Sequence, residues 1–197
     1  MNPWDTRYEV EDYVYGTTAN DFLVSVADRI PMGRVLCLAE GEGRNAVFLA
    51  EKGYSVTAVD FSRVGLQKAH RLAAQQGVSI ETCCTDLREF VIHPNQWQGI
   101  VAIFAHVPPE VRVPLHRAAV AGLVTGGAFI LEAYTPQQLH YKTGGPPVAE
   151  LMMSLPDLQT ELMGLEWAIA QEKTRFIQEG TLHSGMSAVV QLLGFKH

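Results

Sequence analysis

The stretch RVLCLAEGEGRN, residues 34–45, decides the fold of this 197-residue chain. Its first residues are almost wholly apolar, which is typical of a strand buried on both faces. Two glycines then permit a tight turn, and GRNAVFLAEKG, residues 43–53, carries apolar residues at helical spacing. The stretch therefore predicts a buried strand, a glycine turn and a helix, an arrangement that often holds a nucleotide.

The alternation of apolar strands and helical patterns continues along the chain. Further strands are expected at residues 54–60, 78–84, 99–105 and 128–134. Helical patterns run from the capping residue Ser62 to Gly77 and from Pro108 to Gly122, and residues 125–127 are expected to form a turn. Strands that alternate with helices pair in parallel, so we expect an α/β fold with a doubly wound, three-layer αβα Rossmann-like sheet.

The last third of the chain has a different pattern. LEWAIAQEKTRF, residues 165–176, and SAVVQLLGF, residues 187–195, are typical of strands, and no segment of helical length separates them. We therefore expect a C-terminal antiparallel hairpin at one edge of the sheet. The preceding segment, residues 135–149, is rich in proline and glycine, and a loop of that length is usually functional or disordered.

Composition narrows the class of partner. The net charge is −6 and lysine and arginine form no cluster, which argues against nucleic acid. No apolar run is long enough to cross a membrane, and the N-terminus is not that expected of a signal peptide. Cys37, Cys83 and Cys84 have no metal-ligand spacing, so we expect buried free thiols in the cytoplasm and no metal. The partner is expected to be a small molecule, and the protein a monomer or a weak homodimer.

Carboxylates follow two predicted strands at the edge of the sheet where ligands bind. Gly41 and Gly43 let the backbone approach a ligand, and Asp60 stands where a carboxylate can accept hydrogen bonds from ribose hydroxyls. Asp86 follows the third strand and can accept from the exocyclic amine of adenine. This pattern suits NAD and S-adenosylmethionine alike.

Two glutamates in the glycine turn favour S-adenosylmethionine over NAD. A pyrophosphate at a helix N-terminus requires amide donors and positive potential, whereas Glu40 and Glu42 bring negative charge. S-adenosylmethionine carries a sulfonium and an ammonium but no phosphate. A dehydrogenase usually has a further catalytic domain, and we expect none within these 197 residues. The glutamates are therefore expected to face a cationic ligand.

The sequence resembles the class I S-adenosylmethionine-dependent methyltransferases, and within them the tellurite-resistance and thiopurine-methyltransferase-like group. The segments that carry the resemblance are LAEGEGRNAVFLAEKGYSVTAVDFS (38–62), TDL (85–87), FAHVPPE (104–110) and GGAFILEAY (126–134). The resemblance implies strand order 3-2-1-4-5-7-6 and cofactor contacts at Gly41, Gly43, Asp60, Asp86 and Leu87. The chain departs from the family pattern at Cys37, where an acidic residue is usual, and at Ala39, where a glycine often stands.

A methyl transfer needs an aligned acceptor, excluded water and, for a protonated acceptor, a base. The expected cofactor-binding residues are Glu40, Gly41, Glu42, Gly43, Asp60, Phe61, Asp86, Leu87, Phe104 and Ala105. The expected catalytic residues are His106, Glu132 and Tyr134. The expected substrate or lid residues are Arg7, Tyr8, Tyr15, Tyr141, Glu179 and His183.

Each of these assignments has a structural alternative. His106 could cap the helix at Pro108 or hold its loop, and Glu132 could pair with a partner such as Arg7. Glu179 and His183 could be solvated turn residues. The aromatic segment 4–20 could simply pack on the core, although aromatic rings also attract a sulfonium.

The chain is expected to form one domain with three parts. These are a lid segment and helix at residues 1–30, a cofactor-binding core at 31–135, and a variable loop with the hairpin at 136–197. Thr18 and Asp21 are placed like a capping box for the helix 21–30. The expected function is S-adenosylmethionine-dependent methyl transfer to a small-molecule acceptor by in-line displacement. The alternatives are a non-catalytic S-adenosylmethionine-binding module and an NAD(P)-binding oxidoreductase.

Overall fold

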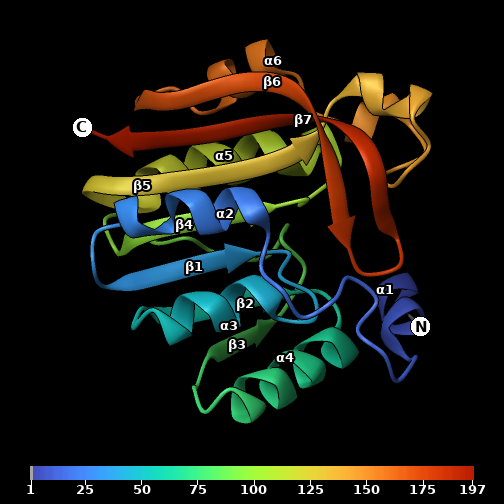
Figure 1. Ribbon diagram of the computed structural model, residues 1–197. Coiled ribbons are helices and arrows are strands. Elements are labelled where there is room, and N and C mark those ends of the chain that lie inside the picture. Colours follow the sequence, from blue (N-terminus) through green and yellow to red (C-terminus); the bar gives the residue numbers. More distant parts are fainter. Residues whose placement is uncertain (1) are drawn as a thin grey trace.

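Seven strands form one sheet in the order β3-β2-β1-β4-β5-β7-β6, as expected (Figure 1). The computed structural model describes residues 2–197. Strands β1 to β5 pair in parallel, and β7 is antiparallel to both β5 and β6. The strands are β1 (Arg34–Leu38), β2 (Ser55–Asp60), β3 (Glu81–Cys84), β4 (Trp97–Ile103), β5 (Leu123–Tyr134), β6 (Leu165–Glu179) and β7 (His183–Lys196).

Helices cover both faces of the sheet, which confirms the doubly wound fold. The α-helices are α1 (Pro3–Tyr8), α2 (Asp21–Val26), α3 (Arg44–Glu51), α4 (Arg63–Gln75), α5 (Pro109–Gly122) and α6 (Leu155–Glu161). Short 3₁₀ turns are η1 (Ala27–Arg29), η2 (Pro136–His140) and η3 (Ala149–Leu151). Helices α2, α3 and α4 contribute to one apolar cluster, and α5 and α6 to the other.

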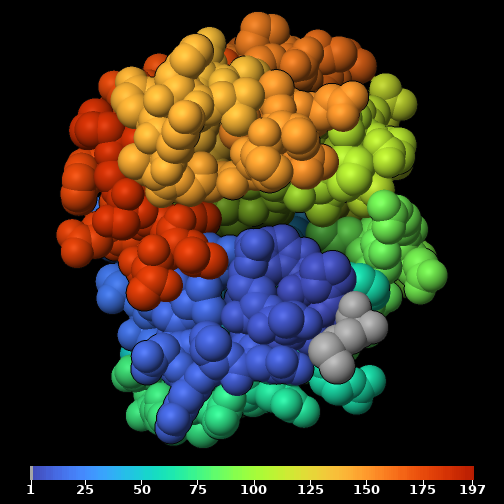
Figure 2. Space-filling model, turned by 90° about the vertical axis from the view of Figure 1, so that its right-hand side faces the viewer, coloured from blue at the N-terminus to red at the C-terminus, as the bar shows by residue number. Residues whose placement is uncertain are grey.

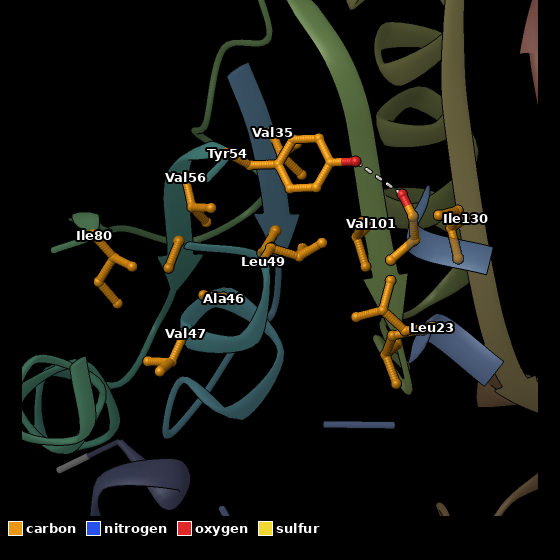
Figure 3. Packing of buried hydrophobic residues seen from close by; sticks show 14 of the residues in the cluster. Leu23, Val35, Ala46, Val47, Leu49, Tyr54, Val56, Ile80, Val101 and Ile130 are labelled. Atoms are coloured by element: carbon orange, nitrogen blue, oxygen red, sulfur yellow. Dashed lines mark hydrogen bonds between the residues drawn. The ribbon is translucent and has the colours of Figure 1, made fainter. Parts of the chain in front are cut away.

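Alternation along β1 explains how one strand serves both clusters. Val35 and Cys37 point into the cluster beneath α2 to α4, while Leu36 and Leu38 point toward α5. Figure 3 shows the first cluster, in which the Tyr54 hydroxyl donates to a backbone carbonyl of the segment after α2. The strand is therefore buried on both faces, as its apolar sequence predicts.

Three local expectations were wrong, and one helix was not predicted. Strand β3 begins at Glu81 because the amide of Val78 instead donates to Ala73 at the end of α4. The expected turn at residues 125–127 is an irregular part of β5, whose pairing with β4 shifts register there. Asn20, and not Thr18, caps α2. Helix α6, which follows the long loop, was not expected.

The cysteines only partly match the expectation of buried thiols. All three are free. Cys37 is buried in β1, whereas Cys83 is half-buried and Cys84 is exposed. The difference arises because β3 is the edge strand, so its residues lack a neighbouring strand on one side.

A buried lysine ties the N-terminal segment, residues 2–20, to the sheet. Only 1% of the Lys68 side chain is exposed, and its Nζ lies 2.5 Å from Glu42 Oε1. The same ammonium donates to the carbonyls of Tyr8, Val10 and Asp12 at 3.4, 2.9 and 2.7 Å. One cation on α4 thus holds both the glycine turn and the segment that covers it. In Figure 2 the blue N-terminal residues lie against the red tip of the hairpin.

A second buried cluster joins α5 to α6. Arg112 donates to Glu161 through Nε and Nη2, at 3.1, 3.0 and 2.8 Å, and His116 Nδ1 lies 2.7 Å from the same carboxylate. Burial by itself raises the pKa of Glu161, but the hydrogen bonds from His116 and Arg112 outweigh this effect and lower it to about 2. The ionised carboxylate therefore stabilises the folded state.

Stability should fall in acid through Glu161. Its pKa is about 2 when folded and near 4.5 when unfolded, so its contribution is complete above pH 4.5 and is lost as the pH falls toward 2. The loss amounts to about 3 kcal/mol by linkage. Urea unfolding of Glu161→Gln between pH 2 and 5 should give a shallower pH dependence than the wild type. Glu150→Gln, at an exposed position in η3, is the control, and equal slopes for Glu161→Gln and wild type would contradict this role of Glu161.

Removing the Lys68 ammonium should destabilise the protein and open the N-terminal segment. Lys68→Met leaves Glu42 buried without its cation, which should cost about 3–5 kcal/mol of unfolding free energy. Proteolysis within the exposed residues 9–12 should become faster. In Lys68→Met/Glu42→Gln much of the lost stability should return, because no unpaired charge remains. Equal stability of the single and double variants in chemical denaturation would show that the pair does not carry this energy.

Candidate active site

A cavity of about 610 Å³ lies across the carboxyl ends of β1, β2 and β4. It is lined by the turn after β1, by Asp60 and Phe61 after β2, and by the segments that follow β3 and β4. The N-terminal segment, the loop after β5 and the hairpin tip complete its wall. The cavity is therefore at the edge of the sheet where the sequence predicts ligand binding.

Glu40 supplies an internal hydrogen-bond acceptor at the start of α3. Its Oε1 accepts from the amides of Asn45 at 2.9 Å and Ala46 at 2.8 Å, two of the donors that open this helix. Burial raises the pKa of Glu40 to about 7, although the two amides and Arg44 oppose that rise. Oε1 of Glu40 therefore satisfies two of the amide donors at this helix terminus.

The charge of Glu42 is compensated within the protein. Lys68 lies beside Oε1, and Oε2 accepts from the amide of Tyr15 at 3.2 Å. The expectation that both glutamates present free negative charge to a cationic ligand is therefore wrong for Glu42 and weakened for Glu40. Both residues line the cavity, but each has a structural partner.

Asp60 connects the ends of β1 and β2. Its Oδ2 accepts from the amide of Gly41 at 2.8 Å, and its Oδ1 accepts from the amide of Ser62 at 2.7 Å. Burial raises the pKa of Asp60, while these amides act in the opposite direction. Each oxygen keeps a further lone pair, so the carboxylate can still accept hydrogen bonds from a ligand in the cavity.

The glycines serve close packing more than direct contact with the cavity. A Cβ at Gly41, where φ is +63°, would lie 2.6 Å from the Tyr8 hydroxyl, so only glycine lets α1 settle here. A Cβ at Gly43, where φ is +92°, would lie 2.4 Å from the Cβ of Ala69 on α4. Neither glycine lines the cavity, although both shape its floor.

Two residues that are not glycine take left-handed backbone conformations at neighbouring strand ends. Ala39 follows β1 with φ of +51°, and Phe104 follows β4 with φ of +52°. Both line the cavity. Such conformations cost about 1–3 kcal/mol and cluster at functional sites. Ala39 stands where the methyltransferase pattern often has a glycine, which would take this backbone conformation without strain.

The predicted adenine end of the site is open to solvent. Phe61 is 50% exposed and lines the cavity together with Asp86 and Leu87. Asp86 is paired with Arg88 at 3.0 Å and accepts from the amide of the same residue. Ala105, expected here, is buried and does not line the cavity.

His106 is held by both ring nitrogens. Nδ1 lies 2.8 Å from the carbonyl of Leu151, so it carries the proton, and Nε2 accepts from the amide of Tyr134 at 3.2 Å. Burial lowers the pKa of His106 to about 4. The ring therefore fixes the loop after β4, which matches the structural alternative for this residue.

Glu132 is fully buried and lies outside the cavity, in a network of polar side chains. Arg175 donates to both of its oxygens at 2.7 Å, and Asn20 and Gln191 donate at 2.5 and 2.8 Å. Glu132 thus has a structural partner, as the alternative reading expected, but the partner is Arg175 of the hairpin and not Arg7. Tyr134 is also fully buried, and its hydroxyl forms no hydrogen bond within residues 2–197.

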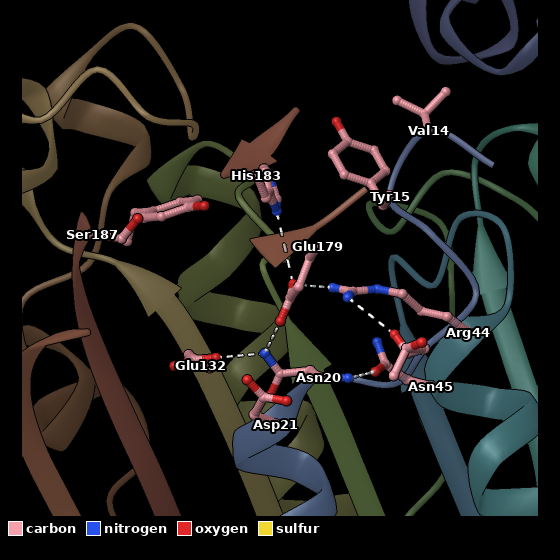
Figure 4. A network of polar contacts seen from close by, with 12 residues as sticks. Val14, Tyr15, Asn20, Asp21, Arg44, Asn45, Glu132, Glu179, His183 and Ser187 are labelled. Atoms are coloured by element: carbon pink, nitrogen blue, oxygen red, sulfur yellow. Dashed lines mark hydrogen bonds and ion pairs between the residues drawn. The ribbon is translucent and has the colours of Figure 1, made fainter. Parts of the chain in front are cut away.

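Figure 4 shows that a polar network continues from Glu132 to the hairpin turn. Asn20 bridges Glu132 and Glu179, and Arg44 donates to Glu179 at 2.6 Å. Burial by itself raises the pKa of Glu179, but His183, Arg44 and Asn20 together lower it to about 2. The network therefore anchors the hairpin tip, where His183 lines the cavity, against α2 and α3.

The N-terminal segment forms an aromatic wall. Trp4 stacks on Tyr8 with a centroid distance of 5.9 Å, and the Arg7 guanidinium lies 4.7 Å from the centroid of Trp4. Arg7 also donates to the Tyr15 hydroxyl at 3.1 Å. All four side chains line the cavity, whereas Tyr141, also expected there, does not.

Two charged residues of this region, Lys68 and Arg44, were not predicted from the sequence. Lys68 occupies the apolar face of α4, and a lysine among buried neighbours at helical spacing was the available signal. Arg44 lies directly after the glycine turn, and only its closeness in sequence to two glutamates pointed to it. Within residues 2–197 no cluster of histidine, cysteine or acidic side chains could hold a metal ion. No described helix is long and apolar enough to span a membrane.

Part of the chain matches a known family of domains. Residues 35–127 match the family described as methyltransferase domain. A 2-heptyl-1-hydroxyquinolin-4(1H)-one methyltransferase from Mycobacteroides abscessus is 26% identical over 141 residues, which are 70% of this chain and 60% of that protein. The chain thus matches less than two-thirds of the length of this relative.

Solved structures share the fold over nearly the whole chain. TehB from Haemophilus influenzae has a TM-score of 0.72 at 16% identity, over 98% of this chain and 66% of that one. A SAM-dependent methyltransferase from Methanosarcina mazei has a TM-score of 0.64 at 16% identity, over 91% and 98%. Together with the sheet order, these similarities show that the chain has the fold of S-adenosylmethionine-dependent methyltransferases.

Proposed function

We propose that the protein transfers a methyl group from S-adenosylmethionine to a small-molecule acceptor. The observation that carries the proposal is the single cavity that runs from the carboxylates after β2 and β3 to the aromatic rings of the N-terminal segment and hairpin. One end suits a nucleoside, and the other suits an acceptor. Its volume of about 610 Å³ is within the range of small-molecule sites.

The donor set fits the nucleoside part of the cofactor. Asp60 keeps acceptor capacity for ribose hydroxyls, and Asp86 and Leu87 border the half-open end where an adenine would lie beside Phe61. When bound, the cofactor supplies a methyl group that its sulfonium already activates. The chain then has to orient the acceptor and exclude water. The aromatic side chains of residues 4–15 line the cavity, and there they can exclude water and orient the acceptor.

The same turn argues against a dinucleotide. A pyrophosphate at the N-terminus of α3 would need the amides of Asn45 and Ala46, which Glu40 already occupies. A diphosphate would also lie against a buried carboxylate. The turn therefore does not offer the pyrophosphate site that an NAD(P)-binding oxidoreductase would need.

The acceptor is proposed to be a small aromatic molecule. The relative from Mycobacteroides abscessus is named for a hydroxyquinolinone substrate, and aromatic rings line the cavity of this chain. Flat rings offer offset or edge-to-face contacts to such an acceptor. Cytoplasmic location, the absence of nucleic-acid partners and a monomeric or weakly dimeric state stay predictions.

Binding of S-adenosylhomocysteine should depend on Asp60. In calorimetry, Asp60→Ala should weaken the binding by about 10- to 100-fold, because charge-assisted hydrogen bonds to the ribose are lost. Asp28→Ala removes an exposed carboxylate that does not line the cavity and should bind like the wild type. Circular dichroism of Asp60→Ala must show a folded protein, since this residue also caps backbone amides.

The two alternative functions give different results in the same titrations. Binding of NAD(H) without binding of S-adenosylhomocysteine would support an oxidoreductase and contradict the proposal. Binding of S-adenosylhomocysteine without methylation of any aromatic hydroxyl or thiol in a broad panel would support a non-catalytic binding module.

A further inference from the structure

His183 is the histidine of the cavity whose ring is not fully engaged in hydrogen bonds. It is 8% exposed and lines the cavity at the tip of the hairpin. Its Nδ1 is buried without a hydrogen bond and lies 4.0 Å from Glu179 Oε2. Its Nε2 forms no hydrogen bond with the described residues. His106, by contrast, has a partner at each ring nitrogen and cannot accept a further proton without losing one.

Three aromatic rings fix the orientation of the His183 imidazole. Tyr15 packs against it at a centroid distance of 4.7 Å, Phe104 at 4.9 Å and Tyr134 at 5.4 Å. The last two meet it edge to face, at interplanar angles of 73° and 89°. A histidine confined in this way presents the same nitrogen to the cavity, which general acid–base catalysis requires.

Glu179 is placed to orient this ring. Its carboxylate is held by Arg44 and Asn20, so it is fixed beside Nδ1. A proton on Nδ1 that faces this carboxylate leaves the lone pair on Nε2. The separation of 4.0 Å is longer than a hydrogen bond, and such contacts commonly tighten when a ligand binds.

We propose that His183, oriented by Glu179, takes the proton from the hydroxyl or thiol of a planar aromatic acceptor. This inference rests on the proposed methyl transfer and names its acceptor class and its base. Aromatic walls from Tyr15 and Phe104 favour a planar acceptor. Arg7 lines the same cavity and has no carboxylate partner within residues 2–197, so it can stabilise the anion that forms.

The proton and electron pairs balance in this step. The O–H or S–H bond of the acceptor breaks, its electron pair stays on oxygen or sulfur, and a new N–H bond forms at His183 Nε2. That electron pair then makes the bond to the methyl carbon while the carbon–sulfur bond of the donor breaks and leaves its pair on sulfur. The proton on His183 passes to solvent.

Charged and titratable groups from several elements set the protonation of His183. They are Glu179 of the hairpin, Arg44 of α3, Arg7 of α1, Tyr15 of the N-terminal segment, Tyr134 of β5 and His106 after β4. Burial lowers the pKa of His183 below its ordinary 6.5, and Arg44 acts in the same direction, while Glu179 opposes them. The imidazole is therefore uncharged at neutral pH and able to accept a proton.

The first test uses the protein without any ligand. Nitrogen-15 NMR of the histidine rings, assigned with His183→Gln, should show a proton on Nδ1 of His183 and none on Nε2 at pH 7. Glu179→Gln should lower the pKa of His183 further, because the opposing carboxylate is gone. A proton on Nε2, or a pKa that does not move in Glu179→Gln, would overturn the proposal.

The second test compares two acceptors that differ in acidity. The wild type is assayed with a phenol that is protonated at the assay pH and with an aromatic thiol that is already ionised. His183→Gln should reduce kcat/KM for the phenol by about 100-fold and leave the thiol nearly unchanged. The exposed His70→Gln is the control and should leave both unchanged.

The outcomes separate this proposal from the proposed function. An equal loss for phenol and thiol would mean that His183 only holds the acceptor. No methylation of either acceptor by a wild type that binds S-adenosylhomocysteine would overturn the aromatic acceptor class. No binding of S-adenosylhomocysteine would overturn the methyltransferase function itself, while the NMR result would still report on the pair of His183 and Glu179.

Discussion

The site depends on one buried cation, the ammonium of Lys68. The ammonium pairs with Glu42 in the glycine turn. Water does not compete for this pair, because the Lys68 side chain is almost fully buried. The same ammonium binds three carbonyls between Tyr8 and Asp12, so the cover of the cavity and its floor share one anchor. A charge of this kind is costly to bury unless each of its protons has a partner, and here the chain folds back to supply them.

The same rule accounts for the other acidic residues around the cavity. Glu40 is held by the amides of α3, Glu132 by Arg175, and Glu179 by Arg44. These carboxylates hold helices and hairpin in place around an aromatic cavity. By contrast, Asp60 keeps lone pairs without a partner, and His183 forms no hydrogen bond with the described residues.

The sequence predicts the fold well and the site only in part. Strand order, the glycine turn and the carboxylates at the strand ends follow from patterns over a few residues, or from the family resemblance that they carry. The structural roles of Glu132 and His106 were among the alternatives, but their partners Arg175 and Leu151 could not be identified, because they are distant in sequence. The pairing of Lys68 with Glu42 could not be predicted either. It neutralises the Glu42 charge that, in the sequence, favours a cationic ligand. Secondary-structure propensities and the spacing of apolar residues are local patterns, so they do not predict contacts between residues that are distant in sequence.

The most direct measurement is a crystal structure of the protein with S-adenosylhomocysteine. The account predicts the ribose hydroxyls at Asp60, the adenine beside Phe61 and Asp86, and the sulfur directed toward the part of the cavity that His183 lines. It also predicts that Glu40 keeps its hydrogen bonds to the amides of α3. Ligand density outside this cavity, or a nucleoside that leaves Asp60 without contact, would contradict the central claim.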